Sequence, residues 1–438
     1  DTMALSHADG RTLLWDYVPW EQMSKQRRGV MWSLQLAREL NRQLVLPPLR
    51  FLTKSEARKQ VDDPGEAYDY RPYSHIFDIS ALHQLHPVVD LHDFVAHEGS
   101  GSRPQHSIDL VFSILRGVSP DLKNVKSGLP LWKEGECMQS LTLANPGREV
   151  CTIDDGGSEQ CATPIAFAGV EGGIRVRNHT CGWSPEMRWD RLLQTRDIRE
   201  LPTVGIQGII YQLPAPPSMR ELSSLRQSLA RGEKGCGWRC TYSTLRLAMV
   251  YQPRFVEAAR RFLEATREAH GTPSSSAQPS APPLAPRVLA VHWRRGDFAM
   301  NRGGMEEKEC IDIATGAAID PCVRRKVVLS PTELGLVLRK QLAEARSTII
   351  FLASDAREKE LAELRASLGS TPLIRYEAPA TAVPGEFRLE GTPELAVMDT
   401  LVCALADAFI GTRRSMFSWN ILEERIVQGM APETGRLM

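Results

Sequence analysis

The chain has 438 residues, and its 53 Lys and Arg balance its 53 Asp and Glu. Because one hydrophobic core rarely organises that many residues, the length predicts two domains of roughly 150–250 residues each. The zero net charge argues against a protein that binds nucleic acid through bulk electrostatics, and no apolar run approaches the roughly 18 residues of a membrane span. No signal peptide is visible at the start, so we expect a mature or trimmed chain.

The first predicted elements are a strand, a helix and a second strand. Residues 13–17 are apolar and β-prone, and 44–46 form another apolar run before two prolines. Between them, apolar side chains recur every three or four residues from Val30 to Leu40, which predicts an amphipathic helix. This order is typical of the opening of a Rossmann-like sheet. Glu21 then lies in the loop just beyond the first strand, at the edge where ligands bind; the alternative is an ordinary solvated carboxylate.

The middle of the chain gives fewer signals. Residues 88–91 and 203–213 are predicted to be strands, whereas 109–200 show no clear period. Residues 242–269 predict one long helix, which Pro253 should kink because proline lacks the backbone N–H that a helix interior needs.

A stretch rich in Ser, Pro and Ala follows from 271 to 287 and predicts a flexible loop or linker. Beyond it, strands and helices alternate regularly, which implies a parallel sheet with right-handed crossovers. Ser330-Pro331-Thr332-Glu333 is a capping box with proline at the first helical position, a strong signal for a helix start. The predicted strands of this part are 288–291, 348–352, 373–374 and 408–410.

We therefore predict an α/β protein of the GT-B type, with two Rossmann-like domains facing across a cleft. Residues 1–270 would form the N-terminal domain, which contains Glu21. Residues 271–287 would be the linker, and 288–438 would form the C-terminal domain.

The segment after the strand 288–291 concentrates functional groups, because it reads His292-Trp293-Arg294-Arg295-Gly296-Asp297-Phe298. In an open α/β sheet, ligands bind at the carboxyl ends of the strands. Two guanidinium groups at this edge would offer forked donors suited to a phosphate. Equally, Arg294 or Arg295 could form a structural ion pair with Asp297, and the local sequence does not separate these interpretations.

The nine cysteines follow no regular zinc-type spacing. Together with the glycosylation sequon Asn178-His179-Thr180, they favour an oxidising secretory compartment. We expect a disulfide to close the loop between Cys310 and Cys322. Because nine is an odd number, at least one thiol stays free or pairs outside the chain, and Cys403 on an apolar helix pattern is the candidate for a buried free thiol.

Four stretches of the chain resemble, in the same order, the protein O-fucosyltransferase family. The segment 292–298 is similar to the family's H-x-R-R-x-D-F signature, and four ordered motifs are more specific than any one alone. The resemblance covers both ends of the chain, whereas 99–240 and 271–330 are weakly matched. The other three stretches are Pro19-Trp20-Glu21 with Arg27-Arg28 and Leu44–Pro48, then His75–Asp78 with Pro87–Val89 and Phe94–Ala96, and last Asp399 with Cys403, Phe409–Thr412, Ser415–Ser418 and Glu423–Arg425.

This resemblance implies a peptide-O-fucosyltransferase, a glycosyltransferase that moves fucose from GDP-fucose to a Ser or Thr hydroxyl with inversion and without a metal. It makes 1–270 the acceptor side and 288–438 the GDP-fucose-binding domain. It points to the branch of the family that modifies thrombospondin type 1 repeats, so we expect a folded, disulfide-bonded repeat as acceptor and the endoplasmic reticulum lumen as location. The sequence contains no D-x-D, the usual handle for a metal-bound diphosphate.

The resemblance also assigns roles to individual residues. Glu21 would be the base that takes the proton of the acceptor hydroxyl, and Arg294 would neutralise the departing GDP. The start of the last helix would meet the anionic donor, because free backbone N–H groups favour anions there. Asp355 would hold the guanine or ribose, with a helix N-cap as the alternative. The donor-binding set implied in this way is Trp20, Gln22, Met23, Ser24, His292, Asp355, Asp399, Ser415, Met416 and Phe417.

The chain departs from the family pattern in two places. Met416 stands where the family has a threonine, which removes one hydroxyl donor to the phosphate. Residues 22–24 replace a Gly-Phe-Asn run, and the spacing to Arg27 is one residue longer, so the assignment of Glu21 depends on where that gap is placed. Two other functions stay open: a related GT-B enzyme with another nucleotide sugar or a glycan acceptor, and a catalytically inactive module that binds a peptide.

Overall fold

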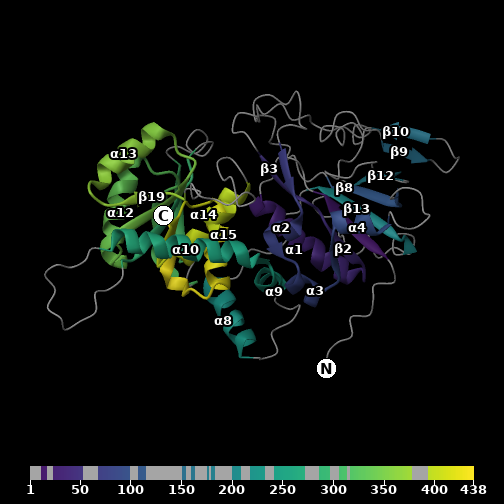
Figure 1. The fold of residues 1–438 in the computed structure, drawn as a ribbon, viewed down its shortest axis with the longest axis horizontal. Helices are drawn as coiled ribbons and strands as arrows, with labels where there is room; N and C mark the ends of the chain where they lie inside the picture. The colour runs from purple at the N-terminus through teal and green to yellow at the C-terminus, as the bar shows by residue number, and fades with distance from the viewer. Residues whose placement is uncertain are drawn as a thin grey trace. The chain divides into compact units, whose positions relative to one another are not determined.

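The chain forms two compact units (Figure 1). Unit 1 comprises Asp1–Pro214 with Ala248–Val250, and unit 2 comprises Ala215–Leu247 with Tyr251–Met438. Each unit contains its own parallel sheet. The computed structural model describes residues 11–16, 23–52, 68–98, 107–114, 150–153, 159–162, 175–176, 179–182, 200–208, 218–231, 241–271, 286–295, 305–312, 316–376 and 393–438.

The main sheet of unit 1 has six parallel strands in the order β12-β8-β13-β1-β2-β6. Strand β1 (Thr12–Asp16) lies between β2 (Gln43–Leu46) and β13 (Thr203–Gly208), so the strand order reverses beside it. The sequence predicted these three strands, the last of them in a longer form. The other strands of this sheet are β6 (Val88–Asp90), β8 (Leu110–Ile114) and β12 (His179–Gly182).

Helix α1 (Met23–Glu39) follows β1 and packs closely on it. A Cβ added at Gly29 would lie 1.6 Å from the ring of Trp15, so only glycine permits this approach. The apolar face predicted from Val30 onward is buried. The helix begins at Met23, seven residues before the apolar pattern from which it was predicted. The proximity of helix and strand confirms the predicted Rossmann-like opening.

Smaller elements complete unit 1. The short sheets pair β3 with β4 and β9 with β10 in antiparallel fashion, and β7 with β11 in parallel. Their bounds, with those of the remaining helices and strands, are β3 Leu49–Leu52, β4 Tyr68–Arg71, α2 Tyr73–Ile76, β5 Phe77–Asp78, α3 Ser80–Leu85, α4 Leu91–Glu98, β7 Ser107–Ile108, β9 Val150–Ile153, β10 Glu159–Ala162 and β11 Arg175–Val176.

The sheet of unit 2 has five parallel strands in the order β19-β18-β15-β20-β21. Numbered along the chain, this is the order 3-2-1-4-5 of a Rossmann-like sheet, and its switch point lies between β15 and β20. The sequence predicted the first four of these strands, and the short β21 is new. Their bounds are β15 Val288–Trp293, β18 Ile349–Ser354, β19 Leu373–Ile374, β20 Ala408–Gly411 and β21 Gly435–Leu437.

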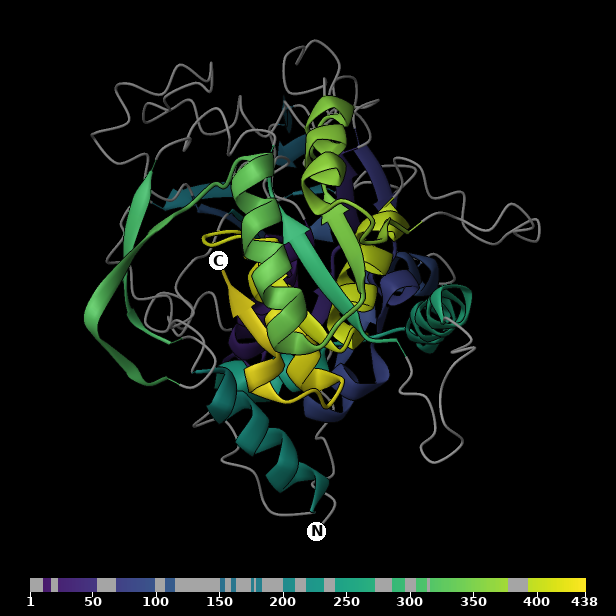
Figure 2. The same cartoon turned by 90° about the vertical axis from the view of Figure 1, so that its left-hand side faces the viewer.

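Helices cover both faces of this sheet, which buries all six residues of β15. Leu289, Val291 and Trp293 face α12 (Pro331–Ala345) and α13 (Glu358–Leu368) in one apolar cluster, and α12 lies in front of the sheet in Figure 2. The opposite face packs against α14 (Pro393–Leu405) and α15 (Met416–Val427), and Phe262 of α10 (Pro253–His270) contacts Phe351 of β18. The capping box at Ser330 and Glu333 begins α12, as predicted. A short 3-10 helix, η4, covers Pro432–Thr434.

Three helices before the predicted linker belong to unit 2: α8 (Met219–Ala230), α9 (Thr241–Ala248) up to Leu247, and α10 (Pro253–His270). The two units therefore divide at Pro214, whereas the sequence predicted a boundary at 270. Long-range polar contacts explain the difference, because Arg246 binds Glu423 and Glu424, and Arg267 binds Asp407. The Ser/Pro/Ala-rich stretch marks no boundary between the units, and its residues 272–285 lie outside the described ranges.

The single kinked helix predicted over 242–269 is wrong. Helices α9 and α10 are separate, with the short strand β14 (Val250–Tyr251) between them. Pro253 occupies the first position of α10. Proline fits there because its fixed φ suits a helix start and the missing N–H has no partner at that position. The proline therefore starts a helix here rather than bending one.

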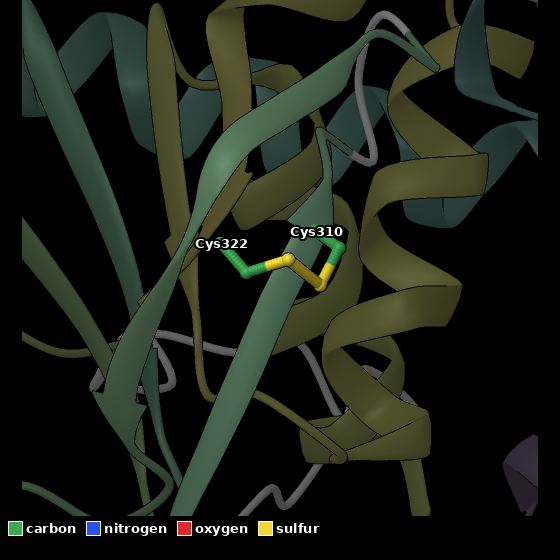
Figure 3. The surroundings of a disulfide bond; sticks show 2 residues. All are labelled: Cys310 and Cys322. Atoms are coloured by element: carbon green, nitrogen blue, oxygen red, sulfur yellow. A yellow bond between two sulfur atoms is a disulfide. The ribbon is translucent and has the colours of Figure 1, made fainter.

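An antiparallel hairpin of β16 (Glu306–Ile311) and β17 (Ala318–Lys326) extends from unit 2 between β15 and α12. The predicted disulfide between Cys310 and Cys322 is present and bridges the two strands (Figure 3). Cys403 is a buried free thiol, as predicted. Among the described helices, none combines the length and apolarity that a membrane crossing requires.

Candidate functional site

The switch point of unit 2 brings two functional segments together. His292 on β15 is in register with Gly411 on β20, so the carboxyl ends of these strands are neighbours. Beyond β15 the chain continues to Arg294 and Arg295, and beyond β20 it turns through Thr412 into α15. In open α/β sheets, ligands bind at this point. This geometry therefore places the arginine motif, Arg294 and Arg295, and the start of the last helix at one edge of the sheet.

His292 is buried and packed against the first turn of α15. Its Nδ1 lies 2.6 Å from the hydroxyl oxygen of Ser418, and its ring lies 4.7 Å from that of Phe417. Gly411 permits this approach, because a Cβ there would meet the Cβ of Ser418 at 2.6 Å. Burial, with a smaller effect of Arg294, lowers the pKa of His292 to about 3. The ring is therefore neutral at physiological pH, with one nitrogen as donor and the other as acceptor.

Arg294 follows β15 and is held by both its backbone and its side chain. Its backbone N–H donates to Thr412 Oγ1 at 2.9 Å, across the switch point. Its guanidinium donates to Asp355 Oδ2 at 2.5 Å, and the Arg294 side chain is 22% accessible. A charge that is anchored yet accessible at this edge can attract an anionic ligand.

Asp355 binds the arginine motif and is not a helix cap. Its second carboxylate oxygen accepts the backbone N–H of Arg295 at 2.7 Å, and the N-cap of α13 is Arg357. The alternative role as N-cap is therefore wrong. Asp355 fixes the direction in which Arg294 leaves the strand, and its predicted contact with a guanine or ribose stays a prediction.

Arg295 points to a different set of partners. Its Nε donates to Glu360 at 2.8 Å and its Nη1 to the carbonyl oxygen of Leu329 at 3.2 Å, while its guanidinium lies 5.2 Å from the ring centre of Trp293. These contacts join Arg295 to α13 and to the segment just before α12. Asp297, the partner proposed for either arginine from the sequence, lies outside the described residues, and Asp355 and Glu360 are the carboxylates found.

The turn between β20 and α15 supplies backbone donors. Thr412 donates from its N–H and its hydroxyl to the carbonyl oxygen of His292, at 3.0 and 2.9 Å, which ties the turn to β15. Ser415 is the N-cap of α15, and its side chain makes no capping bond. Met416 and Phe417 form the first turn, whose N–H groups lack acceptors within the helix. This arrangement can bind an anion through the backbone.

Asp399 lies on α14, and its carboxyl has an unusual pKa. Burial raises this pKa to about 7, although Arg375 opposes the shift. Arg375 follows the carboxyl end of β19 and donates to the carbonyl oxygen of Ser354 at 3.0 Å. A carboxyl that titrates near neutral pH can donate or accept a hydrogen bond to a ligand.

The predicted residues of the N-terminal part are largely outside the description. Trp20, Glu21 and Gln22 lie between the described residues 16 and 23, so their predicted roles stay predictions. Ser24 belongs to α1, but its side chain is not described, whereas Met23 is buried at the start of α1. The segment that contains Trp20, Glu21 and Gln22 follows β1, the strand at the switch point of the unit 1 sheet.

Sequence reasoning gave no role to several residues that build the site in unit 2. Thr412 and Ser418 lie within motifs that the sequence analysis quoted, but only their contacts with Arg294 and His292 reveal what they do. Ser354 ends β18 and Arg375 directly follows β19, and polar residues at the carboxyl ends of strands are a usable signal. Glu360 gave none, because its partner lies 65 positions away. Among the described residues, no group of three His, Cys, Asp or Glu side chains is arranged to hold a metal.

Comparison with known proteins adds relatives of one kind. A family model described as GDP-fucose protein O-fucosyltransferase matches residues 22–428. A protein named GDP-fucose protein O-fucosyltransferase 2 from Drosophila melanogaster is 24% identical over 389 residues, which cover 82% of this chain and 64% of the relative. One of the same name from Pan troglodytes is 25% identical over 376 residues, with coverages of 83% and 71%. The chain thus spans about two thirds of the length of these relatives.

Solved structures resemble the chain in fold. A crystal structure of POFUT1 in complex with GDP has a TM-score of 0.55 and 14% sequence identity, and the match covers 98% of both chains. A structure of POFUT1 in complex with GDP-fucose gives the same values. At this identity the likeness concerns the fold alone. Together with the two parallel sheets, it confirms the predicted α/β architecture of two Rossmann-like domains, the GT-B type.

Proposed function

The chain belongs to the GDP-fucose protein O-fucosyltransferase family, and from this premise we propose that it transfers fucose from GDP-fucose to a Ser or Thr hydroxyl of an acceptor protein. One observation carries the proposal: Arg294 and the start of α15 lie together at the switch point of the unit 2 sheet. That is the place where a Rossmann-like sheet binds a nucleotide.

The donor would bind with its diphosphate at this edge. The N–H groups of the first turn of α15 and the guanidinium of Arg294 are the donors suited to phosphate oxygens. His292, as a neutral ring, and Asp399 would meet the nucleotide through hydrogen bonds, as the resemblance to the family implies. Asp355 would support the site by fixing Arg294, because a preorganised charge stabilises a transition state better than a mobile one.

The transfer itself would proceed by a single displacement with inversion. The Glu21 carboxylate takes the proton of the acceptor hydroxyl, whose oxygen attacks C1 of fucose from the face opposite the phosphate. The bond between C1 and the phosphate oxygen breaks, and GDP leaves with the bonding electrons. Arg294 neutralises the charge that develops on the leaving oxygen. We propose that no metal ion takes part, since the sequence lacks a D-x-D and a guanidinium can take over that role.

We also propose a folded, disulfide-bonded repeat as acceptor, a thrombospondin type 1 repeat, and the lumen of the endoplasmic reticulum as location. The relatives named O-fucosyltransferase 2 support this acceptor, and so does the resemblance on which it was predicted. The disulfide between Cys310 and Cys322 supports a location in the secretory pathway, because disulfides persist in oxidising compartments.

The test is transfer of fucose to a folded thrombospondin type 1 repeat, with UDP-sugars as alternative donors and with a chelator in a parallel reaction. We expect transfer from GDP-fucose alone, unaffected by the chelator, and a product of the opposite anomeric configuration. Glu21→Gln should lower kcat by about 10²–10⁴, because general-base catalysis contributes that much. Glu39→Gln, an exposed carboxylate on α1, is the control. Full activity of Glu21→Gln would overturn the proposed base, and transfer from a UDP-sugar the proposed donor.

A further inference from the structure

The hairpin of β16 and β17 has two carboxylates that face inward, although most of its other residues are exposed. The side chain of Glu309 is 10% accessible and that of Glu307 is 17% accessible. An isolated two-stranded hairpin is marginally stable in water, and the Cys310–Cys322 disulfide strengthens this one by limiting its unfolded alternatives. Sheltered carboxylates on an otherwise exposed ribbon indicate that the hairpin contacts something specific.

These carboxylates contact the turn that follows β20. Glu309 Oε2 lies 2.9 Å from Arg413 Nη2, and the same oxygen accepts a hydrogen bond from Arg325 at 2.5 Å. Glu307 pairs with Arg414. The two arginines of the turn are therefore held by two residues of one strand. Since the hairpin is the next described element after β15 along the chain, these pairs link the part of the chain after β15 to the turn after β20.

The charge on Glu309 is maintained by its partners. Burial alone would raise the pKa of this carboxyl, but Arg413 and Arg325 outweigh burial and lower it. Arg413 is itself buried, with 6% of its surface exposed. The Glu309–Arg413 pair is thus sheltered from water, and opposite charges attract each other more strongly there than on the surface.

The turn needs such support because its backbone is strained. Arg414 has a φ of 61°, in the left-handed region that side chains other than glycine seldom adopt. Residues hold that conformation only when surrounding contacts determine it. Two residues before Arg414, Thr412 accepts a hydrogen bond from the backbone N–H of Arg294. Directly after Arg414, Ser415 is the N-cap of α15. A change in the turn would therefore move both halves of the anion-binding edge.

We propose that Glu309 is a positioning residue for the donor, acting through Arg413, and that the disulfide-closed hairpin thereby sets the geometry of the turn 412–415. The inference rests on the proposed function, since it assumes that the edge formed by Arg294 and α15 binds the diphosphate. Glu309 itself touches neither donor nor acceptor in this account. Its effect should appear in donor binding far more than in the chemical step.

The test measures GDP affinity by calorimetry, and KM and kcat for GDP-fucose, in Glu309→Gln and Arg413→Gln and in the double variant. Glu309→Gln should weaken GDP binding and raise KM by about 10-fold, because the negative charge that holds the buried guanidinium of Arg413 is lost. The value of kcat should change by less than about threefold, since Arg294 and the base remain in place. Adding Glu309→Gln to Arg413→Gln should have no further effect, because both act through one contact.

Glu306→Gln is the matched control, because Glu306 lies on the same strand, is exposed and pairs in register with Lys326 across the hairpin. GDP affinity of Glu309→Gln within twofold of wild type, or effects of the two variants that add in full, would overturn the inference. If Glu309→Gln does not fold, Glu307→Gln decides, with about threefold weaker GDP binding expected from a partly exposed pair and unchanged binding contradicting the inference. A wild-type protein that binds no GDP would instead overturn the proposed function.

Discussion

Two arginines of unit 2 each bind carboxylates, but in opposite surroundings. Arg246 on α9 is fully buried, and its Nε and Nη2 contact Glu423 and Glu424, which are also fully buried. The side chains of Arg294 and Asp355 at the sheet edge are 22% and 35% accessible. An arginine–carboxylate pair therefore joins two helices in the interior of the unit, and another one presents a charge at the edge of the sheet. Inside, a lost partner leaves a buried charge, whereas at the edge water or a ligand can replace it.

Removing Arg246 should produce the largest effect on stability. Burial by itself would lower the pKa of this guanidinium, but Glu424 and Glu423 outweigh burial and raise it, so the group is charged. Arg246→Met removes the buried guanidinium that contacts both buried carboxylates, and the free energy of unfolding should fall by about 3–5 kcal/mol. Urea denaturation measures this change.

Two further variants sharpen this prediction. Arg365→Met removes an arginine from an exposed pair with Glu358 and should change the stability by less than about 0.5 kcal/mol. Combining Arg246→Met with Glu423→Gln and Glu424→Gln should recover part of the loss, because the two buried carboxylate charges that faced Arg246 are then removed as well. A loss below about 1 kcal/mol for Arg246→Met would show that the buried pair does not secure α9.

Removing Arg294 should affect the reaction and leave stability nearly unchanged. Arg294→Ala is expected to lower kcat by about 10²–10³, as the loss of one preorganised donor to a developing charge does in other enzymes. Its free energy of unfolding should stay within about 1 kcal/mol of wild type, because the group is accessible to water. Steady-state kinetics and thermal unfolding of the same preparation test both parts, with Arg365→Ala as control. A large loss of stability with normal kcat would show that Arg294, like Arg246, stabilises the fold and does not act in the reaction.

Asp399 should give a smaller effect, visible as a dependence of stability on pH. Its pKa is raised from 3.8 to about 7 by burial, so between these values the folded state retains a proton that the unfolded state has lost. Stability therefore decreases as pH rises from about 4 to 7. At roughly 1.4 kcal/mol per pKa unit the full shift is an upper bound, and partial solvent access reduces the expected loss to about 1–2 kcal/mol.

Asp399→Asn should remove this loss, so that the variant gains stability relative to wild type as pH rises toward 8. Denaturation curves of the free protein at pH 5 and pH 8 measure the difference. Glu363→Gln, an exposed carboxylate on α13, should leave the pH dependence unchanged. Equal slopes for Asp399→Asn and wild type would mean that the carboxyl ionises normally.

Much of unit 2 could be predicted, because its signals are local. The capping box at Ser330 starts a helix wherever it occurs, since its hydrogen bonds lie within three residues. Cys310 and Cys322 are 12 positions apart, so their pairing needs no knowledge of the rest of the chain. The placement of Arg294 at the end of a buried strand followed from the apolar run before it. One prediction from a local pattern was wrong, because Pro253 starts α10 and does not kink a longer helix.

The division into units and the partners within the site could not be predicted in this way. The sequence placed a boundary at the Ser/Pro/Ala-rich stretch, since composition was the only signal present. The helices before it join unit 2 through contacts such as that between Arg246 and Glu423, which are 177 positions apart. The pKa of Asp399 likewise depends on how many groups surround it, which composition does not record.

The sequence by itself determined the alternation of strands and helices, the family and the position of the arginine motif, because periodicity and ordered motifs are properties of neighbouring residues. Only the tertiary structure decided that Asp355, 61 positions from Arg294, anchors this arginine, and that Glu309 holds the turn before α15. Many carboxylates of the chain could have met these guanidinium groups. The strand order set which carboxylate met Arg294, because the sheet brings the ends of β15 and β18 together at one edge. The hairpin of β16 and β17 brought Glu309 to Arg413.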